Sequence, residues 1–233
     1  MDNGKLKKEN EYYSQLTIHH SRIKTNLVFT VYNDDNDNYS KVEEPDPSLN
    51  YTYADYLQWK FEERLELIKG KIFKMSPAPN VVHQAVSMKL SSSIYNFLKG
   101  KSCKIFSAPF DVRLPVKNKK KDNEIYTVVQ PDICVICDES KLDERGCCGA
   151  PDLIIEILSP GNSRKEVKLK FDLYEEAGVK EYWIISPAEE TVLVYFLQED
   201  GKYIATKMLA AGEYVKSKVV EEFEIEVSEI FSN

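Results

Sequence analysis

Residues 151–179 read PDLIIEILSPGNSRKEVKLKFDLYEEAGV, and this segment predicts a buried strand followed by a helix. Residues 153–158 are apolar on both alternating faces apart from Glu156, as is typical of a strand covered on both sides. An ionised carboxylate is costly to bury alone. We therefore expect Glu156 to face a metal ion, a cation or a neighbour that raises its pKa.

The helix after this strand has recognisable signals at both ends. Ser163 and Glu166 have the S-x-x-E spacing of a capping box, and Gly178 lies where a helix C-terminal glycine is common. At about 100° per residue, Lys170 falls near the centre of the apolar arc that should pack on the sheet. That arc contains Val167, Leu169, Phe171, Leu173, Tyr174 and Ala177. An inward lysine after an inward glutamate indicates a buried salt bridge, a lysine whose stem reaches water, or a catalytic centre.

The two Pro-Asp dipeptides closest before Glu156 are residues 131–132 and 151–152, and strand geometry favours one of them. Asp152 would lie about 13 Å from Glu156 along the same strand, at about 3.3 Å per residue, which is too far to share one metal ion. Asp132 belongs to the preceding strand. If the two strands pair, cross-strand neighbours lie about 5 Å apart, which suits two carboxylates that hold one hard cation. We therefore expect Asp132, Glu156 and Lys170 to meet at one point.

Length and composition predict one sizeable α/β or α+β domain with an extension. The chain has 233 residues, of which 42% are hydrophobic and 30% charged. Residues 1–46 are compositionally separate and contain linker-like runs of Asn, Asp, Glu and Pro, so we expect a polar, partly disordered N-terminal extension with a short strand at 27–32. Residues 47–233 would form the domain.

Charge and cysteine content restrict the class of function and the compartment. The net charge of −7 argues against nonspecific coating of nucleic acid, and less against a metal-dependent nuclease whose acidic site is neutralised by cations. No apolar run is long enough to cross a bilayer, and the N-terminus has no signal-peptide core. Five cysteines, an odd number, argue against a disulfide framework and favour a reducing cytoplasm. Cys134 and Cys137 would point to opposite faces of a strand, so they could not share one zinc ion.

The remaining pattern is mostly strands, with a few helices between them. Strands are expected at 65–68 and 71–75 around a Lys69-Gly70 turn, and at 104–114, 125–129, 132–137, 181–185, 192–197 and 203–209. Helices are expected at 55–63 and after Asn80, and a short helix or strand at 227–231. Glu66 is either a solvent-facing strand residue or a second acid near the site. His83, in the first turn of its helix, is expected to be structural or exposed.

Several motifs together resemble the Uma-type family of restriction-endonuclease-like proteins, a branch of the PD-(D/E)XK nuclease superfamily. They are LELIKGKIFKMSPAPNVVHQ (65–84), APFDVRL (108–114), VVQPDICVI (128–136), GAPDLIIEILSP (149–160), KFDLYEEAGVKEYWII (170–185) and VYFL (194–197). Each motif alone is weak, but their order and number make the combined match strong. The resemblance covers residues from about 51 to 231 and implies an α+β restriction-endonuclease-like core, with a central mixed β-sheet flanked by helices.

The resemblance also implies a site and an activity. Asp132 and Glu156 would be ligands of Mg²⁺, or of Mn²⁺ in its place, Lys170 the catalytic lysine, and Glu66 an accessory acid. The superfamily usually places its lysine two residues after the glutamate, where this chain has Leu158, so the helix would supply the lysine instead. The activity implied is Mg²⁺-dependent cleavage of DNA, with a homodimer by analogy. The alternatives are a catalytically silent DNA- or protein-binding module, and a structural protein in which Glu156 and Lys170 merely pair.

Overall fold

The computed structural model describes residues 28–33, 38–43, 48–59, 64–75, 80–116, 119–160 and 163–232. The chain forms two compact units, residues 1–46 and 47–233. In the first, β1 (Val28–Asn33) and β2 (Asn38–Glu43) pair as an antiparallel hairpin, which confirms the strand expected at 27–32. The linker-like runs, and the disorder expected in them, fall almost entirely outside the described residues.

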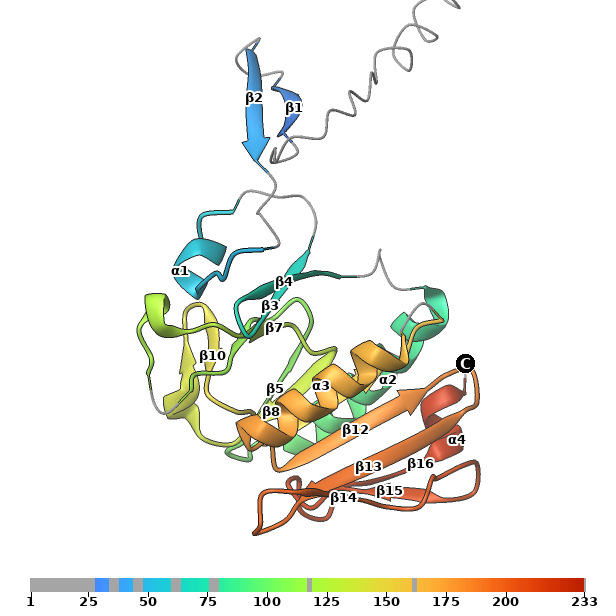
Figure 1. Cartoon of the computed structure of the whole chain (residues 1–233). Coiled ribbons are helices and arrows are strands. Elements are labelled where there is room, and N and C mark those ends of the chain that lie inside the picture. Colours follow the sequence, from blue (N-terminus) through green and yellow to red (C-terminus); the bar gives the residue numbers. More distant parts are fainter. Residues whose placement is uncertain are drawn as a thin grey trace, which may run out of the picture. The chain divides into compact units, whose positions relative to one another are not determined.

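A six-stranded mixed sheet forms the centre of the second unit (Figure 1). Its order is β14 (Tyr203–Ala205), β13 (Thr191–Leu197), β12 (Glu181–Ser186), β11 (Leu153–Ile157), β8 (Ile133–Ile136) and β5 (Lys104–Ser107). β11 and β12 are parallel, and the other neighbours are antiparallel. The mixed sheet and the α+β class expected from the sequence are confirmed.

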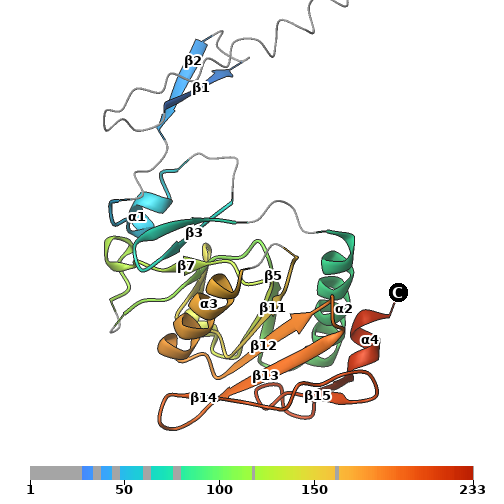
Figure 2. The same ribbon diagram turned by 45° about the vertical axis from the view of Figure 1, so that its right-hand side comes forward.

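Helices pack against both faces of this sheet (Figures 1 and 2). They are α2 (Val81–Leu98) and α4 (Val227–Phe231) on one face and α3 (Arg164–Ala177) on the other. Strand β11 is covered on both faces, which explains why its residues are apolar on both faces. Leu153, Ile155 and Ile157 join the cluster of α2, whereas Ile154 joins that of α3. Because successive strand side chains alternate, Glu156 lies on the α3 face.

A second six-stranded sheet packs over the α3 face of the core. Its order is β4 (Lys71–Lys74), β3 (Leu65–Ile68), β7 (Val128–Val129), β6 (Val112–Arg113), β10 (Gly146–Cys148) and β9 (Leu142–Asp143). Lys69 and Gly70, with φ of 51° and 79°, form the expected β3–β4 turn. The smaller elements are β15 (Tyr214–Lys216), β16 (Glu224–Glu226), and the 3-10 turns η1 (Asp122–Glu124) and η2 (Glu139–Lys141).

The helix expected at 55–63 is largely wrong. Only α1 (Tyr53–Tyr56) is helical, residues 57–58 form a turn, and residues 60–63 lie outside the described part of the chain. Thr52 and Asp55 form a capping box that starts the helix. Tyr53 is buried in a small cluster with Leu67 and Ile125. Tertiary packing of this one turn therefore decides the structure here, rather than helix propensity.

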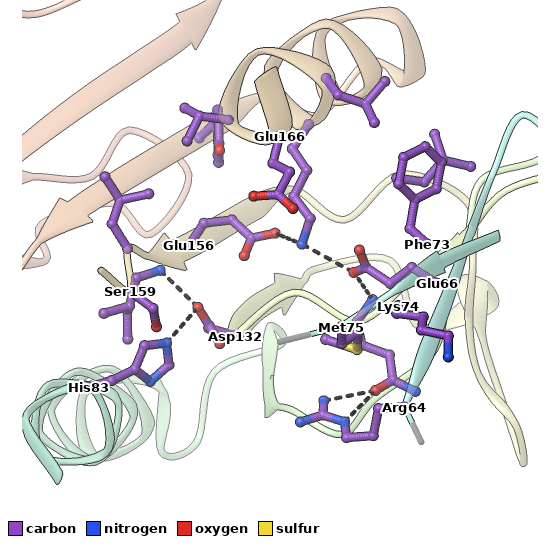
Figure 3. A pocket seen from close by; sticks show the side chains of 18 residues that line it. Arg64, Glu66, Phe73, Lys74, Met75, His83, Asp132, Glu156, Ser159 and Glu166 are labelled. Atoms are coloured by element: carbon purple, nitrogen blue, oxygen red, sulfur yellow. Dashed lines mark hydrogen bonds and ion pairs between the residues drawn. The ribbon is translucent and has the colours of Figure 1, made fainter. Parts of the chain in front are cut away.

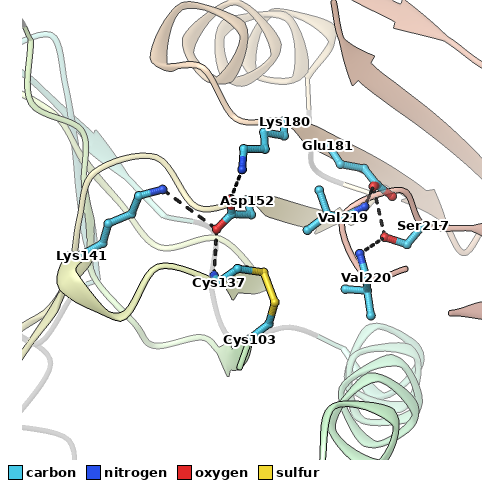
Figure 4. The surroundings of a disulfide bond; sticks show 9 residues. All are labelled: Cys103, Cys137, Lys141, Asp152, Lys180, Glu181, Ser217, Val219 and Val220. Carbon is cyan, nitrogen blue, oxygen red and sulfur yellow. Dashed lines mark hydrogen bonds and ion pairs between the residues drawn. A yellow bond between two sulfur atoms is a disulfide. The ribbon is translucent and has the colours of Figure 1, made fainter. Parts of the chain in front are cut away.

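A disulfide joins Cys103 and Cys137 (Figure 4), a pairing that the argument from the odd number of cysteines did not predict. The register explains it. Lys104 pairs with Ile136 across β5 and β8, which brings the two cysteines just beyond the strand ends face to face. Cys134 is a free, buried thiol in the α3-side core, which agrees with the argument against a shared zinc ion.

Among the described residues, no helix combines the length and apolarity that a membrane crossing requires.

Candidate functional site

A cavity on the α3 face of the central sheet collects all four residues singled out in the sequence (Figure 3). Glu66 comes from β3, Asp132 from the residue before β8, Glu156 from β11 and Lys170 from α3. His83, from the first turn of α2, lines it as well. Five separate elements therefore contribute polar side chains to one hollow.

The two acids expected on paired strands lie at neighbouring positions. Ile155 pairs with Ile133 across β11 and β8, so Glu156 and Asp132 are the next residues in the same antiparallel register. Asp132 Oδ2 accepts a hydrogen bond from the Ile157 backbone N–H at 2.8 Å. Within the described residues, Asp132 Oδ1 and Glu156 Oε2 accept no hydrogen bond, so one oxygen of each carboxylate is available to a ligand.

Lys170 bridges two carboxylates. Its Nζ donates to Glu156 Oε1 at 2.9 Å and to Glu66 Oε1 at 3.1 Å. The Tyr174 hydroxyl donates to the same Glu156 oxygen at 2.6 Å, and the Gln130 backbone N–H donates to Glu66 at 2.9 Å. The expected capping box and the left-handed Gly178, with φ of 82°, define both ends of α3. The apolar face of the helix, with Leu173 and Tyr174 buried in the core, sets the rotation that turns Lys170 inward.

The cavity holds more negative than positive charge. Burial, with smaller contributions from Asp132 and Glu66, raises the pKa of Glu156 to about 7, although Lys170 acts in the opposite direction. Burial alone would lower the pKa of Lys170, but the Glu156 and Glu66 carboxylates raise it overall. When ionised, the inner group of Glu66, Asp132, Glu156 and Lys170 carries a net charge of −2. The exposed side chains of Arg64, Lys74 and Glu166 bring the whole lining to −1. A divalent cation between Asp132 and Glu156 would neutralise the inner excess.

Sequence reasoning missed His83. Its side chain is only 7% exposed, and Nε2 lies 3.3 Å from Asp132 Oδ2. Nδ1 is buried and has no partner among the described residues. Burial lowers the pKa of His83, but the neighbouring Asp132 carboxylate acts in the opposite direction, and the net shift of the pKa is upward.

The spacing of the buried residues along α2 contained a signal for His83. The buried face of α2 is His83, Val86, Leu90, Ile94 and Leu98, whereas Val82 is 55% exposed. His83 thus heads a regular i, i+3, i+7 series.

Asp152, the rejected acid, lies elsewhere (Figure 4). It pairs with Lys180 at 2.7 Å and accepts a hydrogen bond from the Cys137 backbone N–H at 2.8 Å. It does not line the cavity. Within the described ranges, no three His, Cys, Asp or Glu side chains are gathered closely enough to hold a metal ion. An ion here would depend on Asp132 and Glu156, with backbone, water or substrate oxygens completing its shell.

Known proteins resemble about three quarters of this chain. A solved structure from Anabaena variabilis, described as a putative nuclease belonging to DUF820, is 25% identical with a TM-score of 0.60 and covers 78% of this chain and 97% of its own. A Synechocystis protein described as uncharacterized is 26% identical over 176 residues, 74% of this chain and 88% of that protein. The profile of the family Uma2, described as "Putative restriction endonuclease", matches residues 53–228. Since that match spans well over half of the sequence, the chain belongs to this family.

Proposed function

We propose that this protein is a Mg²⁺-dependent endonuclease that hydrolyses phosphodiester bonds in DNA. The observation that carries the proposal is the meeting of Asp132, Glu156 and Lys170 in one cavity, each from a different element. The family and the nuclease-like structural relative support phosphodiester chemistry at this place.

The residues present fit a divalent cation. Mg²⁺ takes oxygen ligands, usually one or two carboxylates with water and substrate phosphate. Asp132 and Glu156 would hold it, together with a backbone carbonyl beside Glu156, and Mn²⁺ would use the same oxygens. When bound, the ion polarises the scissile phosphate and lowers the pKa of a bound water.

The chain's own residues supply the remaining requirements. An ammonium has three donors, and Lys170 donates two hydrogen bonds, one to Glu66 and one to Glu156. The third can point to a phosphate oxygen or to the attacking water. There the charge offsets the negative charge that grows in the transition state. Glu66 and Tyr174 act as positioning residues, since they hold the lysine and Glu156 in place.

The test is incubation with supercoiled, linear and single-stranded DNA, with Mg²⁺ or with EDTA. We expect wild type to cleave only with the metal, and Glu156→Gln and Lys170→Met to lose cleavage. Lys168→Met is the matched control, because Lys168 lies on the exposed face of the same helix and pairs with Asp172. Cleavage by Glu156→Gln and Lys170→Met at the wild-type rate would dispose of the assignment.

A silent binding module with the same fold is the second candidate. The observation that favours it is that Lys170 already pairs with Glu156 and Glu66, so two of the cavity's acids have a counter-charge without a metal ion. A thermal-shift titration separates the two. Stabilisation by Mg²⁺ or Mn²⁺ that disappears in Glu156→Gln supports a working metal site, and DNA binding without any metal response supports the silent module.

Two finer expectations belong to the nuclease proposal. A homodimer would provide two cavities for the two strands of a duplex, and light scattering of the purified protein checks the oligomeric state. The cytoplasm is the proposed location, supported by three free cysteines, Cys134, Cys147 and Cys148. Alkylation of thiols in fresh cell extract would show whether Cys103 and Cys137 are joined there.

A further inference from the structure

Arg64 lines the edge of the cavity with an exposed side chain held in one orientation (Figure 3). It directly precedes β3, the strand that carries Glu66. Its Nε and Nη2 both donate to Gln130 Oε1, at 3.1 and 2.8 Å. Two donors on one acceptor fix the plane of the guanidinium. Nη1 has no partner among the described residues, so part of the donor fork remains available.

The partner of Arg64 is neutral, which sets this arginine apart. Arg113 and Arg145 are paired with the carboxylates of Asp143 and Asp122. In the described ranges, no carboxylate lies within salt-bridge distance of Arg64. An amide oxygen therefore orients the guanidinium, and the Asp111 carboxylate, on the other side of Gln130, interacts with it electrostatically without forming an ion pair. The cavity's inner cation, Lys170, is by contrast shared between two carboxylates.

Gln130 is itself fixed, so it can act as a rigid holder. Its Nε2 donates to Asp111 Oδ1 at 2.9 Å and to the Tyr56 hydroxyl at 3.3 Å. These bonds settle which side-chain atom is the oxygen that faces Arg64. The backbone N–H of Gln130 donates to Glu66. One residue thus joins Arg64 to the carboxylate that holds Lys170.

We propose that Arg64 binds a backbone phosphate of the nucleic-acid strand next to the phosphate that is cut, with Gln130 as its positioning residue. This inference rests on the proposed nuclease function and adds a substrate-binding contact to it. An arginine fork matches phosphate oxygens bidentately and keeps its charge at all relevant pH values. A phosphate contact positions the strand without reading bases. Arg64 therefore contributes to affinity equally for different sequences.

The experiment measures DNA binding apart from cleavage. Fluorescence anisotropy with a labelled duplex, with Ca²⁺ in place of Mg²⁺ and again in EDTA, gives the affinity over a series of NaCl concentrations. Loss of a hydrogen bond to a charged group predicts an affinity about tenfold weaker for Arg64→Gln. The slope of log affinity against log salt should become shallower by about 1. Arg64→Lys should keep the slope but lose part of the affinity.

Gln130→Met separates orientation from charge, because it removes the amide oxygen and keeps Arg64 charged. We expect weaker binding with an unchanged salt slope. Arg145→Gln is the matched control, since Arg145 lies outside the cavity and is already neutralised by Asp122. Its affinity and slope should stay at wild-type values.

Three results would overturn the inference: wild-type affinity in Arg64→Gln, an equal loss in Arg145→Gln, or no binding of DNA by the wild type. Plasmid cleavage in Mg²⁺ is scored separately. Cleavage with no effect of Arg64 on affinity removes this inference alone. Arg64-dependent binding without any cleavage removes the nuclease proposal and leaves the phosphate contact standing.

Discussion

Replacement of Lys170 by methionine tests how the cavity balances its charges. The ammonium lies 2.9 Å from Glu156 and 3.1 Å from Glu66, and the side chains of Lys170, Glu156 and Glu66 are only 20%, 12% and 6% exposed. They form a buried network, for which loss of one partner costs about 3–5 kcal/mol, rather than a surface pair worth about 0–1 kcal/mol. We therefore expect Lys170→Met to lower the free energy of unfolding by about 3–5 kcal/mol at pH 9.

The stability lost in Lys170→Met should depend on pH in a defined direction. The folded-state pKa of Glu156 is about 7, above its ordinary 4.5. The contribution of Glu156 to the free energy of unfolding therefore falls as the pH rises toward 7. Lys170 lowers that pKa, so its removal raises the pKa further and continues the fall above pH 7. Each pKa unit is worth about 1.4 kcal/mol. The stability gap between wild type and variant should therefore widen from pH 6 to pH 9.

Urea denaturation at pH 6, 7.5 and 9 measures this gap. Lys168→Met, which removes an exposed lysine from the same helix, should change the stability little at every pH. Adding Glu156→Gln to Lys170→Met should recover part of the loss, because a neutral amide does not need a cation. A gap that is absent, or that is the same at pH 6 and pH 9, would refute the reasoning.

Two further predictions concern His83 and the disulfide. His83→Leu removes the neighbour of Asp132 at 3.3 Å, and loss of such an outer partner typically weakens metal binding by about 10–100-fold. Calorimetry with Mn²⁺ measures this; wild-type affinity in the variant would show that His83 is only a packing residue. Reduction of the Cys103–Cys137 bond, which spans 34 positions, should lower the free energy of unfolding by about 4 kcal/mol through loop-closure entropy. Denaturation with and without dithiothreitol checks this, and coincident curves would contradict it.

Local signals in the sequence predicted the elements that form the site. The apolar run around Glu156, the Ser163 capping box and Gly178 are each read within a few residues. Between the two caps, the helical period of the apolar residues placed Lys170 on the packed face. The rise per residue along a strand was enough to favour Asp132 over Asp152 as the acid near Glu156. Positions that depend on period and capping were therefore accessible without a structure.

Contacts between distant segments were not accessible in this way. Alternation along the strand could not decide whether Glu66 faces solvent or the site, because β3, a strand of the second sheet, is buried on both faces. The bond between Arg64 and Gln130 spans 66 positions. The pairing of Cys103 with Cys137 depends on the register of β5 against β8. A sequence pattern gives the face of a residue but not the partner that the tertiary fold brings to it.

Calorimetric titration with Mg²⁺ and Mn²⁺ tests most directly whether the acids on paired strands form one centre. Wild type should bind a divalent ion at the cavity, and Asp132→Asn and Glu156→Gln should each lose that binding. Asp152→Asn should retain it, because this buried acid is paired with Lys180 outside the cavity. Ion binding that survives in Asp132→Asn and Glu156→Gln, or that disappears only in Asp152→Asn, would contradict the account.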